Sequence, residues 1–342
     1  MLDDLKMIHG RDGQDMLGLA EKQTMQLTYE FELKGSIRPE DIQNVVYNAM
    51  GGSALPALFA QSWPGSNVPL ELVRGYDLPA YVGNKTLFIA SSFSGNTEET
   101  LSALVQAEDK GAQIAVITNG GELQRIAEEK GYLLALLPQS FSRLSLLYNF
   151  RALLQILEKA AVLQDDFRPQ LKQAANTLEE AVAVWRPDVR TVKNPAKQIA
   201  QELIGKSIVV YSGPRMYAAA YKWKINCNES AKQVAWVNQY PELNHNELTG
   251  WSKQPTAKPY AVIELRSSLE HPRVQKRFEV TERLLSGMRP APIGINVEGE
   301  TLLEQLLWAA LLGDFVGVYL ALLNGLDPAP LPLVDTFKHA LA

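Results

Sequence analysis

One stretch of the chain gathers small polar side chains of the kind that hold anionic ligands. The sequence IASSFSGNTEET, residues 89–100, places five hydroxyl side chains, a glycine and an asparagine between an apolar run and a predicted helix. The first backbone N–H groups of a helix have no partners within the helix, and they attract anions. We therefore predict a phosphate site built from the hydroxyls of Ser92, Ser94 and Thr97. The backbone around Gly95 adds N–H donors, so no lysine is required.

A plain helix cap explains the same stretch equally simply. Asn96, followed three residues later by Glu99, fits an N-cap with a box-like partner, and the stretch alone leaves both interpretations open. A P-loop is excluded, because its GxxxxGK(S/T) pattern is absent. A second glycine turn, in AMGGSALP, places Gly52 and Ser53 between a predicted strand and a helix. Two such loops from neighbouring strands converge on one site, which favours the phosphate over the cap.

Short β-branched runs alternate with longer amphipathic stretches, which is typical of βα units around a parallel sheet. The predicted strands are 44–50, 68–75, 85–91, 112–118 and 132–138, then 206–213, 260–267 and 291–298, with helices between many of them. The stretches NVVYNAMGGSALPALFAQSW and SIVVYSGPRMYAAAYKWK both read strand, glycine turn and small-residue helix. We predict an α/β protein with two doubly wound parallel-sheet domains and helices on both faces of each sheet. The expected divisions are a first domain of 1–165, a helical linker of 166–190 and a second domain of 191–342.

Composition excludes several classes of function. The 342 residues are 46% hydrophobic and 21% charged, and the net charge of -5 without Lys/Arg-rich blocks argues against nucleic acid. One cysteine and four scattered histidines fit neither a disulfide nor a metal site, so we expect no metal and a reducing, cytoplasmic setting. The N-terminus lacks the apolar core of a signal peptide. The apolar stretch 306–323 carries Asp314 at its middle, so we expect a buried helix and no membrane partner.

The motifs together resemble a known family. SSFSGNTEET, with MGGS upstream, resembles the sugar isomerase (SIS) domain, whose phosphate loop has the form Ser-x-Ser-Gly-x-Thr. The segments at 228–251 (NESAKQVAWVNQYPELNHNELTGW) and 325–341 (GLDPAPLPLVDTFKHAL) are similar to the signatures of bifunctional phosphoglucose/phosphomannose isomerases. The resemblance covers most of the chain. It implies two flavodoxin-like SIS domains and cofactor-free interconversion of glucose 6-phosphate and fructose 6-phosphate, with mannose 6-phosphate as a further expected substrate.

The resemblance also implies roles for residues of the second half. Glu229 would carry the proton between C1 and C2, although a plain helix-face pairing with Lys232 explains it as well. His245 would open the sugar ring, since imidazole both gives and takes a proton near neutral pH. The family implies that His245 comes from the other subunit of a homodimer, on a segment that leaves its own domain; otherwise it is an ordinary loop residue. Lys338 would lie near the same ring atoms, or would merely complement the end of a last helix.

The resemblance carries over with some departures. Arg143 matches the family's active-site arginine, a cation that would stabilise the enediolate, but Ser142 stands where proline is usual. The first loop has the bulky pair Leu55–Pro56, and Ala329 replaces a frequent threonine, which bears on the choice between C2 epimers. The implied phosphate-binding set is Gly52, Ser53, Ser92, Ser94, Gly95, Asn96 and Thr97.

Two other functions fit parts of the sequence. A phosphosugar-binding sensor would keep the phosphate loop without chemistry, but the presence of Glu229, His245, Arg143 and Lys338 together, with no helix-turn-helix segment, speaks against it. A ketose-aminating isomerase would need an ammonia-supplying domain, for which no chain length remains. An aldose–ketose isomerase therefore remains the leading hypothesis.

Overall fold

The computed structural model describes residues 1–63, 65–163, 166–253 and 259–341. Its contacts divide into two compact units. The first unit is Gln23–Asn176, and the second unit is Met1–Lys22 together with Thr177–Ala342. The first 22 residues thus group with the C-terminal half, and the division after Asn176 falls inside the expected linker of 166–190.

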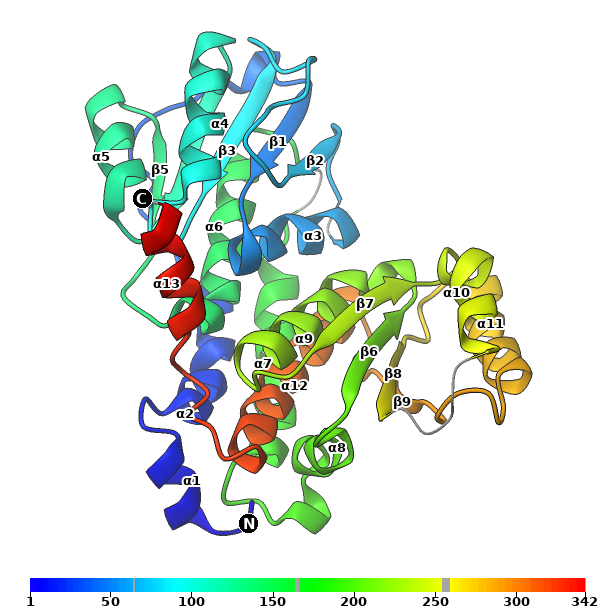
Figure 1. The fold of residues 1–342 in the computed structure, drawn as a ribbon. Coiled ribbons are helices and arrows are strands. Elements are labelled where there is room, and N and C mark those ends of the chain that lie inside the picture. Colours follow the sequence, from blue (N-terminus) through cyan, green and yellow to red (C-terminus); the bar gives the residue numbers. More distant parts are fainter. Residues whose placement is uncertain (64, 164–165, 254–258, 342) are drawn as a thin grey trace. The chain divides into compact units, whose positions relative to one another are not determined.

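The first unit contains a five-stranded parallel sheet (Figure 1). Its strands are β1 (Asn44–Asn48), β2 (Leu70–Val73), β3 (Thr86–Ser91), β4 (Gln113–Thr118) and β5 (Leu133–Leu136). The order across the sheet is β2-β1-β3-β4-β5, so the first strand of the sequence has a neighbour on each side. Every residue of β3 and β4 is buried, as expected for central strands covered on both faces.

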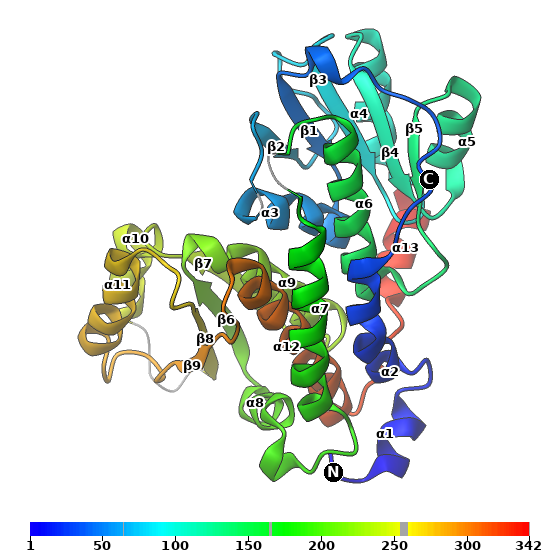
Figure 2. The same cartoon turned by 180° about the vertical axis from the view of Figure 1, so that it is seen from behind.

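Helices cover both faces of this sheet, as the two opposite views in Figures 1 and 2 show. The helices are α3 (Leu55–Ser62), α4 (Glu98–Asp109), α5 (Gly121–Lys130) and α6 (Leu146–Lys159). On one face, Phe88 and Val116 of the sheet share a core cluster with Leu104 of α4 and Leu123 of α5. On the other face α3 packs on α6, with the Phe59 and Phe150 rings 5.9 Å apart. The predicted doubly wound arrangement is therefore confirmed for this unit.

The second unit contains a four-stranded parallel sheet in the order β7-β6-β8-β9. Its strands are β6 (Ser207–Ser212), β7 (Ala235–Gln239), β8 (Tyr260–Arg266) and β9 (Ile293–Asn296). Its helices are α1 (Leu5–Arg11), α2 (Met16–Glu21), α8 (Pro195–Leu203), α9 (Tyr217–Glu229), α10 (Leu243–Trp251), α11 (Pro272–Leu284), α12 (Leu302–Leu323) and α13 (Pro332–Leu341). A further helix, α7 (Arg168–Trp185), crosses the division between the units. In Figure 1, α9 and α12 lie on one side of the sheet and α10 and α11 on the other.

The two sheets repeat one plan. The order β2-β1-β3-β4 of the first unit matches β7-β6-β8-β9 of the second, and both β1 and β6 lead through a 3-10 turn into a helix. The predicted echo between the two halves is thus confirmed. The sequence did not predict β7, which forms an edge of its sheet and leaves Trp236 52% exposed.

The long apolar helix α12 lies inside the second unit. By length and hydropathy it is one helix that would pass for a membrane span, but 94% of its apolar window is buried in protein. Asp314 at its middle is itself buried and lies 2.6 Å from Lys222 Nζ, while Asn226 Nδ2 donates to it at 2.9 Å. A charge at this depth is tolerated because it is paired and hydrogen-bonded. The prediction of a buried core helix is therefore confirmed.

Candidate active site

Two loops that follow neighbouring strands meet beside β1 and β3. One is the 3-10 helix η3 (Gly51–Ala54) after β1, and the other comprises residues 92–97 after β3. Phe93 N donates to Ser53 Oγ at 3.3 Å, which joins the two loops directly. Tyr47 of β1 donates through its hydroxyl to Ser53 O at 3.0 Å, and burial raises the pKa of Tyr47, so this hydroxyl keeps its proton. The expected convergence of the loops is confirmed.

Ser92 is the centre of a hydroxyl cluster in the loop 92–97. Its buried Oγ lies 2.7 Å from Thr97 Oγ1 and 3.4 Å from Ser94 Oγ, and it accepts a hydrogen bond from Gly95 N at 3.2 Å. Ser94 is exposed and Thr97 is half-buried. Hydroxyl groups rotate to donate or accept, so this cluster can turn its O–H donors toward an anion.

The start of α4 differs from that of an ordinary capped helix. Thr97 occupies the N-cap position with an extended backbone (φ -72°, ψ 118°), yet among the described residues its side chain makes no capping hydrogen bond. Asn96, interpreted in the sequence as a possible N-cap, instead accepts from Glu122 N at 2.9 Å, in the first turn of α5. The cap interpretation of Asn96 is therefore wrong for α4. The first-turn amides of a helix have no partners within the helix, so those of α4 can bind an anion beside the hydroxyl cluster.

A third loop, after β4, fixes the shape of the loop 92–97. Asn119 N donates to Phe93 O and Leu123 N donates to Gly95 O, both at 3.0 Å. Gly95 has a φ of +71°, and a Cβ there would lie 1.8 Å from Gly120 O. Only glycine permits both this conformation and this approach. The third loop was not identified from the sequence, although two successive glycines after an apolar run are typical of a tight turn.

Arg143 lies in the same unit as these loops, after β5. It sits in a 3-10 helix, Ser142–Leu144, is 7% exposed, and holds its guanidinium carbon 5.1 Å from the centre of the Phe141 ring. Ser142 is exposed at the first position of that helix, a position that also suits proline, so the departure from the family leaves this turn intact. Leu55 and Pro56 are buried at the start of α3, where proline is favourable.

Glu229 and Lys338 both lie in the second unit. Glu229 is the last residue of α9 and is half-buried. Lys338 belongs to α13, and its side chain lies outside the described residues. Ala329, just before α13, is buried, and its N–H donates to Asp327 Oδ1 at 2.8 Å. The structure thus places Glu229 at a helix end and Lys338 on a terminal helix, within the segments that matched the family signatures.

His245 lies in the first turn of α10, and its side chain is exposed. The expectation that its segment leaves its own domain is wrong: Leu243 and Trp251 at the two ends of α10 belong to the core cluster of the second unit. Asn244 Nδ2 also donates to Thr281 Oγ1 of α11 at 2.9 Å. Helix α10 is therefore anchored on its own sheet, and the exposed side chain of His245 is not part of that core.

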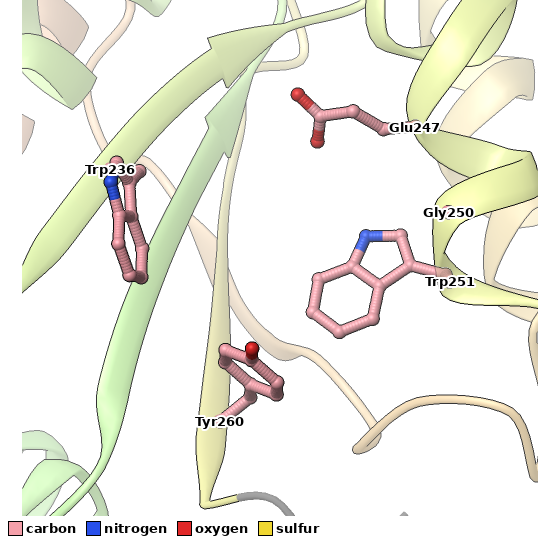
Figure 3. Close-up of a pocket in the computed structure, with 5 residues that line it drawn as sticks. All are labelled: Trp236, Glu247, Gly250, Trp251 and Tyr260. Atoms are coloured by element: carbon pink, nitrogen blue, oxygen red, sulfur yellow. The ribbon is translucent and has the colours of Figure 1, made fainter. Parts of the chain in front are cut away.

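A pocket of about 230 Å³ opens beside α10 in the second unit (Figure 3). It is lined by Trp236, Glu247, Gly250, Trp251 and Tyr260. The Glu247 carboxylate accepts hydrogen bonds from the hydroxyl of Tyr211 and from Asn238 Nδ2, and burial together with this carboxylate raises the pKa of Tyr211. This lining differs entirely from the set of residues predicted to bind or convert a substrate.

The structure therefore gathers the predicted residues in two groups. The phosphate-binding set lies together around η3 and the loop 92–97 of the first unit, with Arg143 in the same unit. Glu229, His245 and Lys338 lie on three different helices of the second unit. Within the described ranges, no three His, Cys, Asp or Glu residues come together as a metal site would require.

Known proteins place these features in one family. Residues 192–341 match the model of the bacterial phospho-glucose isomerase C-terminal SIS domain. A bifunctional phosphoglucose/phosphomannose isomerase from Caldicellulosiruptor bescii is 34% identical over 93% of this chain and 96% of its own length. A D-glucosamine-6-phosphate 4-epimerase from Sulfolobus acidocaldarius is 33% identical over 62% of this chain and 65% of its own length.

A solved structure shows the same fold. A glucose-6-phosphate isomerase like protein from Thermus thermophilus superposes with a TM-score of 0.65, covering 99% of this chain and 98% of the other, at 17% identity. That likeness shows the fold alone, namely two parallel sheets with helices around each. The sequence match over nearly the whole chain goes further, and by it this chain belongs to the bifunctional phosphoglucose/phosphomannose isomerase family.

Proposed function

We propose that the chain interconverts glucose 6-phosphate and fructose 6-phosphate, and likewise mannose 6-phosphate and fructose 6-phosphate. The two aldoses differ only at C2, so one enediolate connects either of them to the ketose. The observation that carries the proposal is the start of α4 beside the Ser92 hydroxyl cluster, in a chain whose full-length relative is named for both isomerisations. Such a helix start, with its amides and dipole, suits a dianionic 6-phosphate.

The phosphate anchor has a defined set of donors. Hydroxyls of Ser94 and Thr97, with Ser92 behind them, hold phosphate oxygens together with the first-turn amides of α4. The amide around Gly52 and the side chain of Ser53 complete the set from the first loop. Asn96 contributes through its side-chain Nδ2, because its Oδ1 accepts from Glu122 N at 2.9 Å and its backbone N–H donates to Ser94 Oγ at 3.3 Å.

Proton transfer is assigned to Glu229. With the sugar in its open form, the carboxylate takes the proton from C2 of the aldose, and the electron pair moves through C1 to the carbonyl oxygen, which gives an enediolate. The carboxyl group then delivers a proton to C1, partly after exchange with solvent, while the O2 hydroxyl proton passes to O1 and O2 becomes the carbonyl oxygen, so no electron leaves the molecule. Arg143 is assigned the role of stabilising the negative charge that develops on the enediolate, because a fixed cation in a buried setting does so strongly.

Ring opening is assigned to His245 with Lys338. Because His245 is exposed on the outer face of α10, the proposal includes a homodimer in which this helix serves the site of the other subunit. The anchoring of α10 on its own sheet suits this role, since a group offered to a partner must be held in place. We also place the protein in the cytoplasm, as befits an enzyme whose single cysteine is a buried free thiol.

Incubation with fructose 6-phosphate, with glucose and mannose 6-phosphates measured separately, tests the proposal. We expect both aldoses to appear, with solvent deuterium entering at C2. Tight binding of the substrate without either product would favour the phosphosugar sensor instead. Epimerisation of glucosamine 6-phosphate at C4, with fructose 6-phosphate left unchanged, would assign the chain the chemistry in the name of its Sulfolobus relative.

A further inference from the structure

One lysine connects the end of α9 to the chain that leads into α13. Lys232 Nζ donates to Ser230 O at 3.2 Å, to Asp327 O at 3.0 Å and to Pro328 O at 3.1 Å. Ser230 directly follows Glu229, and Asp327 and Pro328 lie a few residues before α13. One ammonium therefore holds two stretches of backbone that are almost 100 positions apart in the sequence.

A second side chain joins the same two stretches. Asn324, the C-cap residue that follows α12, donates through Nδ2 to Ala231 O at 3.2 Å and to Gln233 Oε1 at 3.0 Å. We call Lys232 and Asn324, with their acceptors, the terminal clamp. The clamp binds the chain after α12 to the turn after α9, so the C-terminal ends of these two helices are held together.

The backbone conformation of Lys232 would suit glycine better than lysine, which indicates that the lysine side chain itself is needed at this position. Its φ is +52°, in the left-handed region that glycine and asparagine adopt most easily. A lysine there stores backbone strain, and such strain tends to persist where the surrounding structure over-determines it. Glycine would relieve the strain but would lose the three donors of the ammonium, which glycine cannot replace.

We propose that Lys232 and Asn324 are positioning residues for the isomerisation: they set the C-terminal segment that carries Lys338 against the end of α9 that carries Glu229. This inference rests on the proposed function of those two residues. Neither clamp residue touches the substrate in this scheme. A displacement of about 1 Å between reacting groups lowers turnover by up to about 10²-fold, so loss of the clamp affects kcat while the phosphate anchor of the first unit keeps its affinity.

Three substitutions of Lys232 separate the side chain from the backbone. Lys232→Met keeps the stem and removes the ammonium, Lys232→Gly relieves the strained φ and also removes the ammonium, and Lys232→Arg retains donors. We expect kcat for fructose 6-phosphate to fall by about 10-fold or more in the Met and Gly variants, with KM changed by less than about 2-fold, and to recover partly in the Arg variant. Lys276→Met, which removes an exposed pair with Glu279 on α11, is the matched control and should leave kcat unchanged.

Hydrogen exchange gives a readout that does not depend on activity. In Lys232→Met the amides of residues 325–341 should exchange faster, and those of the first unit should not change. Unchanged exchange there would overturn the clamp, even if the wild-type chain proved to have no isomerase activity. Wild-type kcat in both Lys232→Met and Lys232→Gly, or a parallel loss of kcat and phosphate affinity, would overturn its role in positioning the catalytic segments.

Discussion

Replacement of Gly95 by alanine is the sharpest test of the loop 92–97. The φ of +71° costs an alanine about 1–2 kcal/mol. Its Cβ would also lie 1.8 Å from Gly120 O and 2.9 Å from Thr118 Oγ1, so the loop must move away from the third loop. That movement breaks the bond from Leu123 N to Gly95 O and the bond from Glu122 N to Asn96 Oδ1, worth about 1 kcal/mol each. The expected loss of stability is thus about 3–4 kcal/mol.

Gly111 supplies a matched control within the same unit. It has the same φ of +71°, but a Cβ there meets no atom of the described residues within 4 Å. Gly111→Ala should therefore cost only the backbone term, about 1–2 kcal/mol. The two variants should therefore differ by about 2 kcal/mol in the free energy of unfolding, which urea unfolding measures. This difference is the part of the effect that comes from the close approach of Gly95 to the third loop. Calorimetry with glucose 6-phosphate should show weaker binding for Gly95→Ala, because the loop that carries the donors is displaced, and no change for Gly111→Ala. Equal effects of the two substitutions on stability and affinity would refute the reasoning.

Three further outcomes are expected. Ser94→Ala combined with Thr97→Ala should weaken 6-phosphate binding by at least about 10²-fold while leaving the fold intact, since each charge-assisted hydrogen bond is worth about 1.5–3 kcal/mol; unchanged affinity in calorimetry would remove these hydroxyls from the site. Glu229→Gln should keep the ligand bound but lower turnover by about 10²- to 10⁴-fold, and wild-type turnover would place the base elsewhere. Co-expression of Glu229→Gln with His245→Ala chains should restore about a quarter of wild-type activity, because half of the dimers then contain one intact site of two; mixed dimers that stay inactive, or an active monomer in sedimentation, would return His245 to an ordinary surface role.

The sheets could be predicted from the sequence because their central strands are locally distinctive. The runs that form β3 and β4 are apolar and buried along their whole length, so they need no distant partner to be recognised. Strand β7 is different, because its five residues include Asn238 and Gln239 and leave Trp236 exposed. It becomes a strand only because β6 offers it a free edge, which the local pattern does not contain.

The hydroxyl cluster of the loop 92–97 could be predicted for a similar reason, because its members lie close together in the chain. The partner of Asn96 could not, because Glu122 N lies 26 positions further on and is brought there by the loop after β4. The position of α10 was also misjudged. The sequence of this helix is mostly polar, but its first residue, Leu243, and its last residue, Trp251, are buried. Their spacing allows both to lie on the face of the helix that packs on the sheet. Contacts made across the fold, rather than along the chain, account for what sequence reasoning missed.

The division of the chain into one continuous and one split unit bears on how the protein is made. The first unit, Gln23–Asn176, leaves the ribosome complete and can fold while the rest is being synthesised. The helices α1 and α2 are made before it, yet they belong to the second unit, where Arg11 Nη1 donates to Leu322 O at 2.7 Å. Met16 and Leu17 are buried residues of α2, which packs on α12, so this packing forms only after α12 has been translated. The second unit is therefore completed only at the end of synthesis, when the N-terminal helices meet α12, and an N-terminal fusion would interfere with this last step of folding.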